Sequence, residues 1–401
     1  MGVHFLQNFG PPSFHPIAWT PATAFWKTAA MRVALVATPL FITYAIGARW
    51  VRGLGIAVLG LSIFELYRHV QARFPSSVTL TSRELISCPP SNMDPKKHAI
   101  YRTMHGLPLP HEKITLTTIP PSQLPSTDLN ILAHTTQFKI SPNLFSYKRD
   151  VSQTVELWKN QWWVDFGSIR HYTKSSGLRT QSDLLTAEHP TLLCVSAYFQ
   201  QQHPNQSLLP GQALLVEGAF RYGAIDNNLF GDPFERASEK DVEKACFSFL
   251  KNHLPIIEDK ICVICPPPEP EAGPKSPYQE EEFAGIFRTA YTAFSAIVKK
   301  NPEAEISTNN WGCRWMDGHP RIVILLQLAA ANFAGVKRLH YSRLPEEAQM
   351  EKETQQEVQD AMTLFENIKY AFTKPQRPLT PSALFSYLTE YAGALGLYRQ
   401  S

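Results

Sequence analysis

The chain has 401 residues and a formal net charge of +3; 44% of its residues are hydrophobic and only 18% are charged. Because globular proteins carry about 25% charged residues, this composition excludes an acidic solvating tail, a disordered chain and a nucleic-acid binder that acts through bulk charge. The charge is uneven: residues 1–80 contain six Lys or Arg and one acidic residue, which gives +5 there and −2 elsewhere. At roughly 150 residues per domain, the length predicts two or three units.

Two uncharged apolar stretches, 33–48 and 53–64, lie within the basic residues 1–80. A membrane-spanning helix needs about 17–25 apolar residues, and flanking aromatic and cationic side chains can extend each stretch to the interface. The connector between them, 49–52, is too short to be a domain. The pattern predicts a two-span transmembrane hairpin with the bulk of the chain on one side of the membrane. A buried soluble helical hairpin is the alternative.

Residues 81–180 read as a proline-rich connector and accessory region. Prolines at 89–90, 120–121 and 125 divide its first half into short pieces. The β-branched run KITLTTI at 113–119 predicts a strand. Three tryptophans, Trp158, Trp162 and Trp163, form an aromatic cluster that suits either a core or a ligand-facing surface.

Residues 181–345 carry an alternating pattern that predicts an α/β domain. Strands are expected at 191–198, 212–220, 260–265, 304–307 and 337–341, and helices at 241–253, 280–299 and 320–334. This order implies a mixed or largely parallel sheet covered by helices. Further helices are expected at 355–371 and 381–395, within a C-terminal helical region over 346–401. Leu384, Phe385 and Leu388 share one face there, which either covers the sheet or presents a groove.

Six cysteines are too few for a disulfide scaffold in a chain of this length. The pair Cys262-x-x-Cys265 could form half of a zinc site or a redox pair, but no second pair accompanies it. The run around it is apolar and strand-like, which favours buried free thiols. We therefore expect no metal and no cofactor.

The turn at 309–320, between an expected strand and a buried helix, carries the sharpest motif. Ligands of parallel α/β sheets bind beyond the carboxyl ends of the strands. Gly312 and Gly318 would let backbone N–H groups approach a diphosphate, and Arg314, His319 and Arg321 are nearby cations. The alternative is a glycine turn with tryptophans packed beneath it.

The segment Asn310-Trp311-Gly312-Cys313, with Gly318 and the run LLQLAA at 325–330, resembles the late phosphate loop and helix of poly(ADP-ribose) glycohydrolases. Those enzymes have a macrodomain fold and carry N-W-G-C-G-A-F-G-G-D ahead of a similar helix. The resemblance implies a macrodomain-like sheet and a site for ADP-ribose or ADP-ribosylated protein. The residues that it places in this site are Asn310, Trp311, Gly312, Cys313, Arg314 and Gly318.

The sequence departs from that family at positions that matter for chemistry. Arg314 stands where the family has glycine, and His319 stands where it has aspartate. The family also has an upstream glycine triplet followed by Q-E-E, whose glutamate acts on the ribose. The nearest counterpart, 216–226, lacks the triplet, and Gln279-Glu280-Glu281 comes after that strand and fits a helix start. No catalytic residue is assigned, and binding alone and residual hydrolase activity are both open.

Cys313 supports a second interpretation, because W-G-C also occurs in thiol proteases that act on ubiquitin-like tails. Their cysteine heads a helix, which lowers its pKa, and a histidine serves as base. Here the helix is expected to begin at Pro320, seven residues later, which is too far for the dipole to act on the thiol. His319 and His340 are the candidate bases.

The whole pattern, a basic bilobed hydrophobic segment before an α/β domain, resembles chlamydial inclusion membrane proteins. Residues 310–342 and the tail at 381–398 also look like a chlamydia-restricted family of similar length. The resemblance implies type III export, a membrane anchor and a domain facing the host cytosol, where unpaired cysteines stay reduced. A non-enzymatic scaffold that binds host proteins is therefore the alternative to a membrane-anchored effector that binds ADP-ribose. No nucleic-acid partner is expected.

Overall fold

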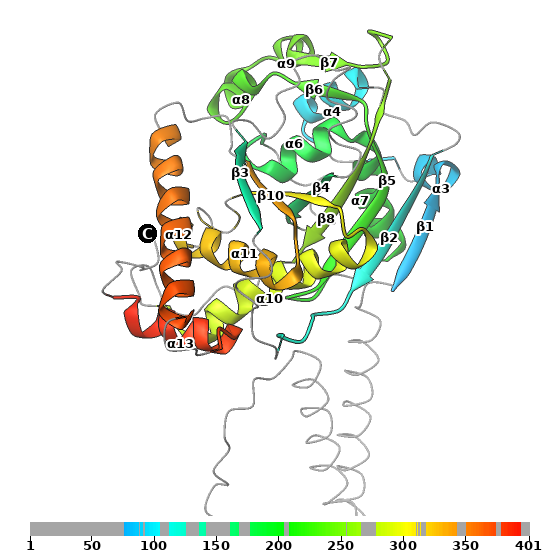
Figure 1. Ribbon diagram of the computed structural model, residues 1–401. Helices are drawn as coiled ribbons and strands as arrows, with labels where there is room; N and C mark the ends of the chain where they lie inside the picture. The colour runs from blue at the N-terminus through cyan, green and yellow to red at the C-terminus, as the bar shows by residue number, and fades with distance from the viewer. Residues whose placement is uncertain are drawn as a thin grey trace, which may run out of the picture. The chain divides into compact units, whose positions relative to one another are not determined.

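The chain divides into two units, Met1–Gln71 and Ala72–Ser401. The computed structural model describes residues 76–87, 89–90, 93–104, 112–125, 136–141, 161–167, 177–203, 208–253, 255–265, 278–309, 311, 313, 318–342, 350–373 and 378–393 (Figure 1). The expected transmembrane stretches, 33–48 and 53–64, lie outside these residues. Within the described ranges, no helix combines the length and apolar character needed to cross a bilayer.

A mixed eight-stranded sheet forms the centre of the described part (Figure 1). Its spatial order is β1 (Ser77–Thr81), β2 (Lys113–Ile119), β5 (Ala213–Arg221), β8 (Ile257–Ile264), β4 (Gln161–Phe166), β9 (Glu305–Thr308), β10 (Arg338–Ser342) and β3 (Gln137–Ser141). Neighbours from β8 to β3 are parallel, whereas β1, β2, β5 and β8 pair antiparallel. The sheet is therefore mixed rather than largely parallel. Residues 81–180, expected as a connector, supply three of its strands.

Helices cover both faces of this sheet. They are α3 (Ser82–Ser87), α4 (Pro95–Thr103), α6 (Gln181–Glu188), α7 (Pro190–Gln202), α8 (Asp232–Arg236), α9 (Glu239–Ala245), α10 (Glu280–Lys300), α11 (Pro320–Ala334), α12 (Met350–Thr373) and α13 (Pro381–Tyr391). Asn227–Leu229 forms a 3₁₀ turn, η2, and β6 (Gly223–Ile225) pairs antiparallel with β7 (Cys246–Ser248). The helices expected from 3.6-residue periodicity, α10 and α11, begin and end within one residue of their expected bounds.

Two of the expected elements are wrong. The run at 191–198 is not a strand. It lies in helix α7, whose first residue is Pro190. Its residues are almost all buried, and an apolar run without alternation does not distinguish a buried strand from a buried helix. The helix expected at 241–253 ends at Ala245, because the next residues pair with β6 as strand β7.

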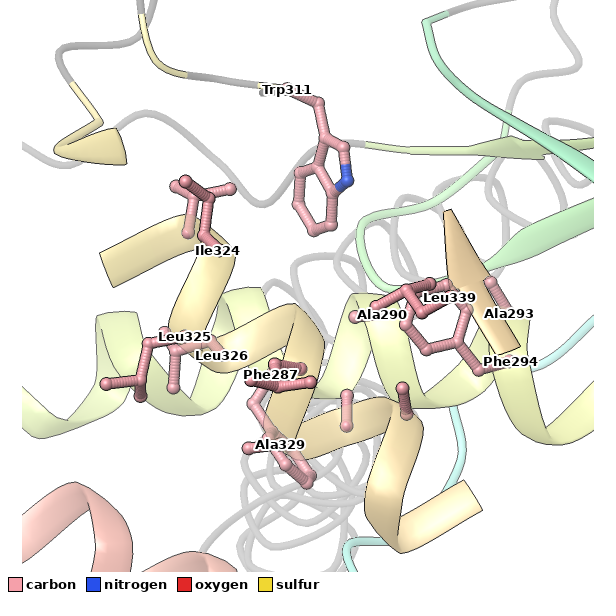
Figure 2. Packing of buried hydrophobic residues seen from close by; sticks show 14 of the residues in the cluster. Phe287, Ala290, Ala293, Phe294, Trp311, Ile324, Leu325, Leu326, Ala329 and Leu339 are labelled. Carbon is pink, nitrogen blue, oxygen red and sulfur yellow. The ribbon is translucent and has the colours of Figure 1, made fainter. Parts of the chain in front are cut away.

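Two apolar cores lie on opposite faces of the sheet, as the alternation of strand side chains requires. Trp162 belongs to the core under α10 and α11, whereas Trp163 belongs to the core under α6 and α7. Both tryptophans are thus packed in cores, and Trp158 lies outside the described residues. Figure 2 shows Phe287 and Phe294 of α10 with Ala329 of α11 in the first core. On its outer side α12 packs on α11 and α13 packs on α10 (Figure 1).

Candidate functional site

Three strand-to-helix connections leave the same edge of the sheet. Strands β8, β4 and β9 are parallel neighbours, so their carboxyl ends lie side by side, and they lead to α10, α6 and α11. This edge is where ligands of parallel α/β sheets bind. The sequence motif at 309–320 forms the third connection, between β9 and α11.

Trp311 is an anchor of this third connection. Its side chain is 4% exposed, and its Nε1–H donates to Thr308 Oγ1 at 3.1 Å. The Thr308 hydroxyl donates to Gln327 Oε1 at 2.7 Å, and Gln327 Nε2 donates to the carbonyl of Asn309 at 3.0 Å. The indole, the strand end and helix α11 are therefore held in one hydrogen-bonded chain.

The three connections also contact one another. The Phe166 ring at the end of β4 stacks on Trp311, with centroids 4.9 Å apart and planes 23° apart. The backbone N–H of His319 donates to the Tyr278 hydroxyl, just ahead of α10, at 2.6 Å. An aromatic stack and a hydrogen bond thus join all three connections into one surface.

The structure describes only half of the predicted site residues. Trp311, Cys313 and Gly318 are described, and all three are buried. Asn310, Gly312 and Arg314 lie outside the described residues. The described members are therefore packed against the domain.

Two of the three cations expected near a phosphate, His319 and Arg321, have partners within the fold. His319 caps α11, and its Nδ1 accepts from the backbone N–H of Arg321 at 3.2 Å. Burial, aided by the charge of Arg321, lowers the pKa of His319, so its ring is neutral at neutral pH. Arg321 itself pairs with Asp360 of α12 at 2.7 Å.

Cys313 does not have the environment of a nucleophile. Its side chain is 4% exposed, and its thiol lies 3.8 Å from the carbonyl of Trp311, to which it donates. Burial, reinforced by Glu357, raises the pKa of the thiol well above its ordinary value. A catalytic thiol needs the opposite shift, so the geometry does not support the protease interpretation.

Sequence reasoning missed the connection between β4 and α6. Gly167 follows β4, and a Cβ there would lie 2.7 Å from Ser182 Oγ, which instead donates to Asp165 Oδ1 at 2.6 Å. Helix α6 begins with Gln181-Ser182-Asp183.

Asp183 is fully engaged in holding this helix start. Its Oδ1 lies 2.8 Å from the ammonium of Lys97, and both side chains are buried. Its Oδ2 accepts from the backbone N–H groups of Arg179 and Thr180 and from the Thr180 hydroxyl, which completes a capping box. The capping pattern T-x-x-D was readable in the sequence, although its position beside β4 was not.

The sequence offered two segments as counterparts of the glycine triplet and the Q-E-E, namely 216–226 and 279–281. Neither supplies a catalytic residue at this edge of the sheet. Residues 216–226 run along β5 toward Arg221, which pairs with Ile257 at the amino end of β8. They therefore approach the opposite edge of the sheet. Gln279 caps α10, its N–H donating to Glu282 at 2.7 Å, and Glu280 and Glu281 form the first turn.

The cysteine pair in β8 lies in the packed sheet. Cys262 is buried and Cys265 half-buried, and burial raises the pKa of Cys265 to about 11 and that of Cys262 further. Across the described ranges, no group of three or more His, Cys, Asp or Glu side chains is arranged to hold a metal ion.

Comparison with known proteins gives a family match for part of the chain. Residues 208–351 match a family model described as Poly (ADP-ribose) glycohydrolase (PARG), Macro domain fold. No curated protein matches the chain.

Several solved structures are similar. Poly(ADP-ribose) glycohydrolase from Deinococcus radiodurans in complex with ADP-ribose is 9% identical, with a TM-score of 0.38 over 72% of this chain and 94% of that one. Its apo form is 8% identical, with a TM-score of 0.35 over 72% and 93%. The Thermomonospora curvata enzyme bound to the inhibitor ADP-HPD is 13% identical, with a TM-score of 0.35 over 67% and 92%. The segment carrying β5 to β10 thus matches the macrodomain of the poly(ADP-ribose) glycohydrolase family, and the mixed α/β sheet is macrodomain-like.

Proposed function

We propose that the α/β domain binds ADP-ribose or a related diphosphate at the carboxyl edge of β8, β4 and β9. The observation that carries this proposal is the family match over residues 208–351, because the matched segment contains the whole connection between β9 and α11. The same connection opens the 15-residue helix α11, whose dipole places positive potential at its amino end.

The anchors of the loop support a binding role. Trp311 and Cys313 are buried at alternate positions, and Gly318 is buried just ahead of the helix. Residues held in this way lose little entropy if they contact a ligand. Gly312, between the two anchors, is where a Cβ would most hinder a phosphate.

Binding rather than hydrolysis is the expected activity. At the start of α6, Ser182 donates to Asp165, and Asp183 is held by Lys97 and its own capping box. A serine hydroxyl is a poor general acid or base near neutral pH. We therefore expect weak or no turnover of poly(ADP-ribose) or of ADP-ribosylated protein.

Calorimetry of the full-length protein with ADP-ribose tests the proposal. Micromolar affinity, about −8 kcal/mol, is the expected result. Gly312→Val should weaken binding at least about tenfold by crowding the phosphate. Lys337→Ala, which removes a surface ion pair with Glu303 beside the amino end of β10, should leave the affinity unchanged. Absence of heat at millimolar ADP-ribose would contradict the proposal.

A membrane anchor in residues 1–80 is part of the same proposal. It is supported by the two apolar stretches and by the +5 charge of that region. With that anchor the domain would act at a membrane surface, facing the cytosol, as an effector of the inclusion-membrane type implied by the sequence resemblance.

The scaffold alternative loses one of its supports. Leu384, Phe385 and Leu388 of α13 are buried in the core that contains α10. The ring centroids of Phe385 and Phe287 are 5.4 Å apart. The apolar face of α13 therefore covers the domain rather than presenting a groove for a host protein.

A further inference from the structure

Among the residues that the structure describes, the first turn of α11 keeps no backbone N–H group for an anion. Pro320, its first residue, has no N–H group. The N–H of Arg321 donates to His319 Nδ1 at 3.2 Å, and those of Ile322 and Val323 donate to the carbonyl of His319 at 3.0 and 3.1 Å. A helix start usually leaves such groups open to a ligand. An anion at this helix start gains from the dipole, but the hydrogen bonds of the turn itself have to come from side chains.

Arg321 supplies the positive charge of this turn. His319 adds none, because its Nδ1 accepts from a backbone N–H and its neutral ring carries the proton on Nε2. Burial lowers the pKa of His319, and the charge of Arg321 lowers it further, so the guanidinium lies close to the ring. The side chain of Arg321 is 39% exposed, so a solute can reach it.

Asp360 of α12 occupies this guanidinium. Its Oδ2 lies 2.7 Å from Arg321 Nη2, and its side chain is 30% exposed. The pair thus joins the start of α11 to α12, which packs on it (Figure 1). An ion pair as accessible to water as this one contributes at most about fivefold to an equilibrium constant. A phosphate offers a guanidinium two parallel charge-assisted hydrogen bonds, so it can displace the carboxylate.

We propose that Arg321 binds a phosphate of the ligand and that Asp360 competes with the ligand for Arg321, so that α12 sets the affinity of the site for anions. This inference rests on the proposed function, which brings a diphosphate to the connection between β9 and α11. On binding, the guanidinium exchanges one oxygen anion for another, and Asp360 turns to solvent. A ligand without a phosphate does not displace Asp360, and the ion pair therefore discriminates against uncharged nucleosides.

Calorimetry of the full-length protein in detergent with ADP-ribose tests the exchange by a double-mutant cycle. Asp360→Asn should tighten binding about fivefold, because Arg321 no longer has to leave a carboxylate. Arg321→Gln should weaken binding roughly tenfold, the value of a hydrogen bond to a charged group. In the double variant Asp360→Asn should bring no gain over Arg321→Gln alone, because Asp360 acts through Arg321.

A control separates this competition from the general effect of negative charge on α12. Glu366→Gln removes the same charge at another turn of the helix, where Glu366 pairs with Lys369 at 2.6 Å, and should leave the affinity unchanged. Wild-type affinity in Asp360→Asn would overturn the proposal. A gain that persists in the double variant would also overturn it, because it would show repulsion through space. Urea unfolding should find each variant folded, since both members of the pair are partly exposed.

Pyrophosphate separates a failure of this inference from a failure of the proposed function. If the wild type gives no heat with ADP-ribose, the proposed function is contradicted, and the same proteins are titrated with pyrophosphate. Binding by Asp360→Asn that is about fivefold tighter than wild type, and is lost in the double variant, would support the exchange for another phosphorylated ligand. Equal behaviour of Asp360→Asn and the double variant toward pyrophosphate, including no binding by either, would overturn it.

Discussion

At the scale of single residues, Trp311 shows how a motif residue can be an anchor of the fold. Its indole is buried, stacked on Phe166 and hydrogen-bonded to Thr308. The loop that carries the glycine turn is therefore attached to the sheet by the tryptophan. The alternative interpretation of the motif, a turn with tryptophan packed beneath it, holds for Trp311 and is compatible with the binding proposal.

Substituting Trp311 by Phe should destabilise the protein more than the same substitution at Trp162. Both side chains are buried in the same core, but among the described residues Trp162 Nε1 has no hydrogen-bond partner. The difference should be about 1 kcal/mol, the net value of one hydrogen bond, measured by urea unfolding. An equal loss of unfolding free energy in both variants would mean that the hydrogen bond to Thr308 adds no stability.

Cys313 should react slowly with alkylating agents in the folded protein. Its thiol is buried and its pKa is raised, as is that of the matched thiol Cys262. Iodoacetamide labelling at pH 8, followed by peptide mapping, should find both cysteines labelled only after unfolding. Rapid labelling of Cys313 alone would revive the thiol protease interpretation.

At the scale of elements, two glycines with positive φ differ in what surrounds them. Gly335 ends α11 at a φ of 76°, with nothing within 4 Å of where its Cβ would be. Gly218 has a φ of 80° at the register shift in β5, and its Cβ would lie 2.0 Å from the carbonyl oxygen of Lys113 on β2. The first glycine is needed only for its backbone conformation, whereas the second also lets two strands approach.

Gly335→Ala should therefore cost about 1–2 kcal/mol, the price of a left-handed conformation with a Cβ. Gly218→Ala carries the same strain and also forces β2 and β5 apart, so its cost should be distinctly larger. Urea unfolding of the two variants measures the difference. If both variants lose the same free energy of unfolding, the close contact with Lys113 is relieved without a loss of stability.

At the scale of the whole molecule, the domain depends on strands that come from far apart in the sequence. β1 begins at Ser77, and it pairs with β2 along its whole length. A truncation that starts at residue 81 would remove most of that edge strand. The division of the chain at Ala72 gives a better boundary for separating the first unit from the domain.

Removal of residues 1–71 should release the protein from membranes. Carbonate extraction of cells expressing the full chain should leave it in the pellet, because a hairpin held by apolar burial resists alkali. The shortened chain should be found in the supernatant. A full-length chain extracted as completely as the shortened one would refute the anchor.

Local signals in the sequence were sufficient to predict most helices and strands in the second half of the domain. The helices α10 and α11 carry their apolar residues at helical spacing and their own end signals, Gln279 with Glu282 and the final Gly335, and the strand between them, β9, is short. The loop motif at 309–320 was also readable, because glycines and tryptophans at a strand end are local features. These elements are encoded by neighbouring residues.

Only the tertiary structure decided the rest. The apolar run at 191–198 is helical because it packs as a buried helix, which its composition alone does not indicate. Strand β5 pairs antiparallel with β8, and residues 216–226 therefore lie away from the candidate site. The contact of Ser182 with Asp165 and the meeting of His189, Arg221 and Asp259 join residues 17 to 70 positions apart. Sequence periodicity reports which residues are buried, but the partner of a buried polar group is set by chain topology, and no local pattern encodes it.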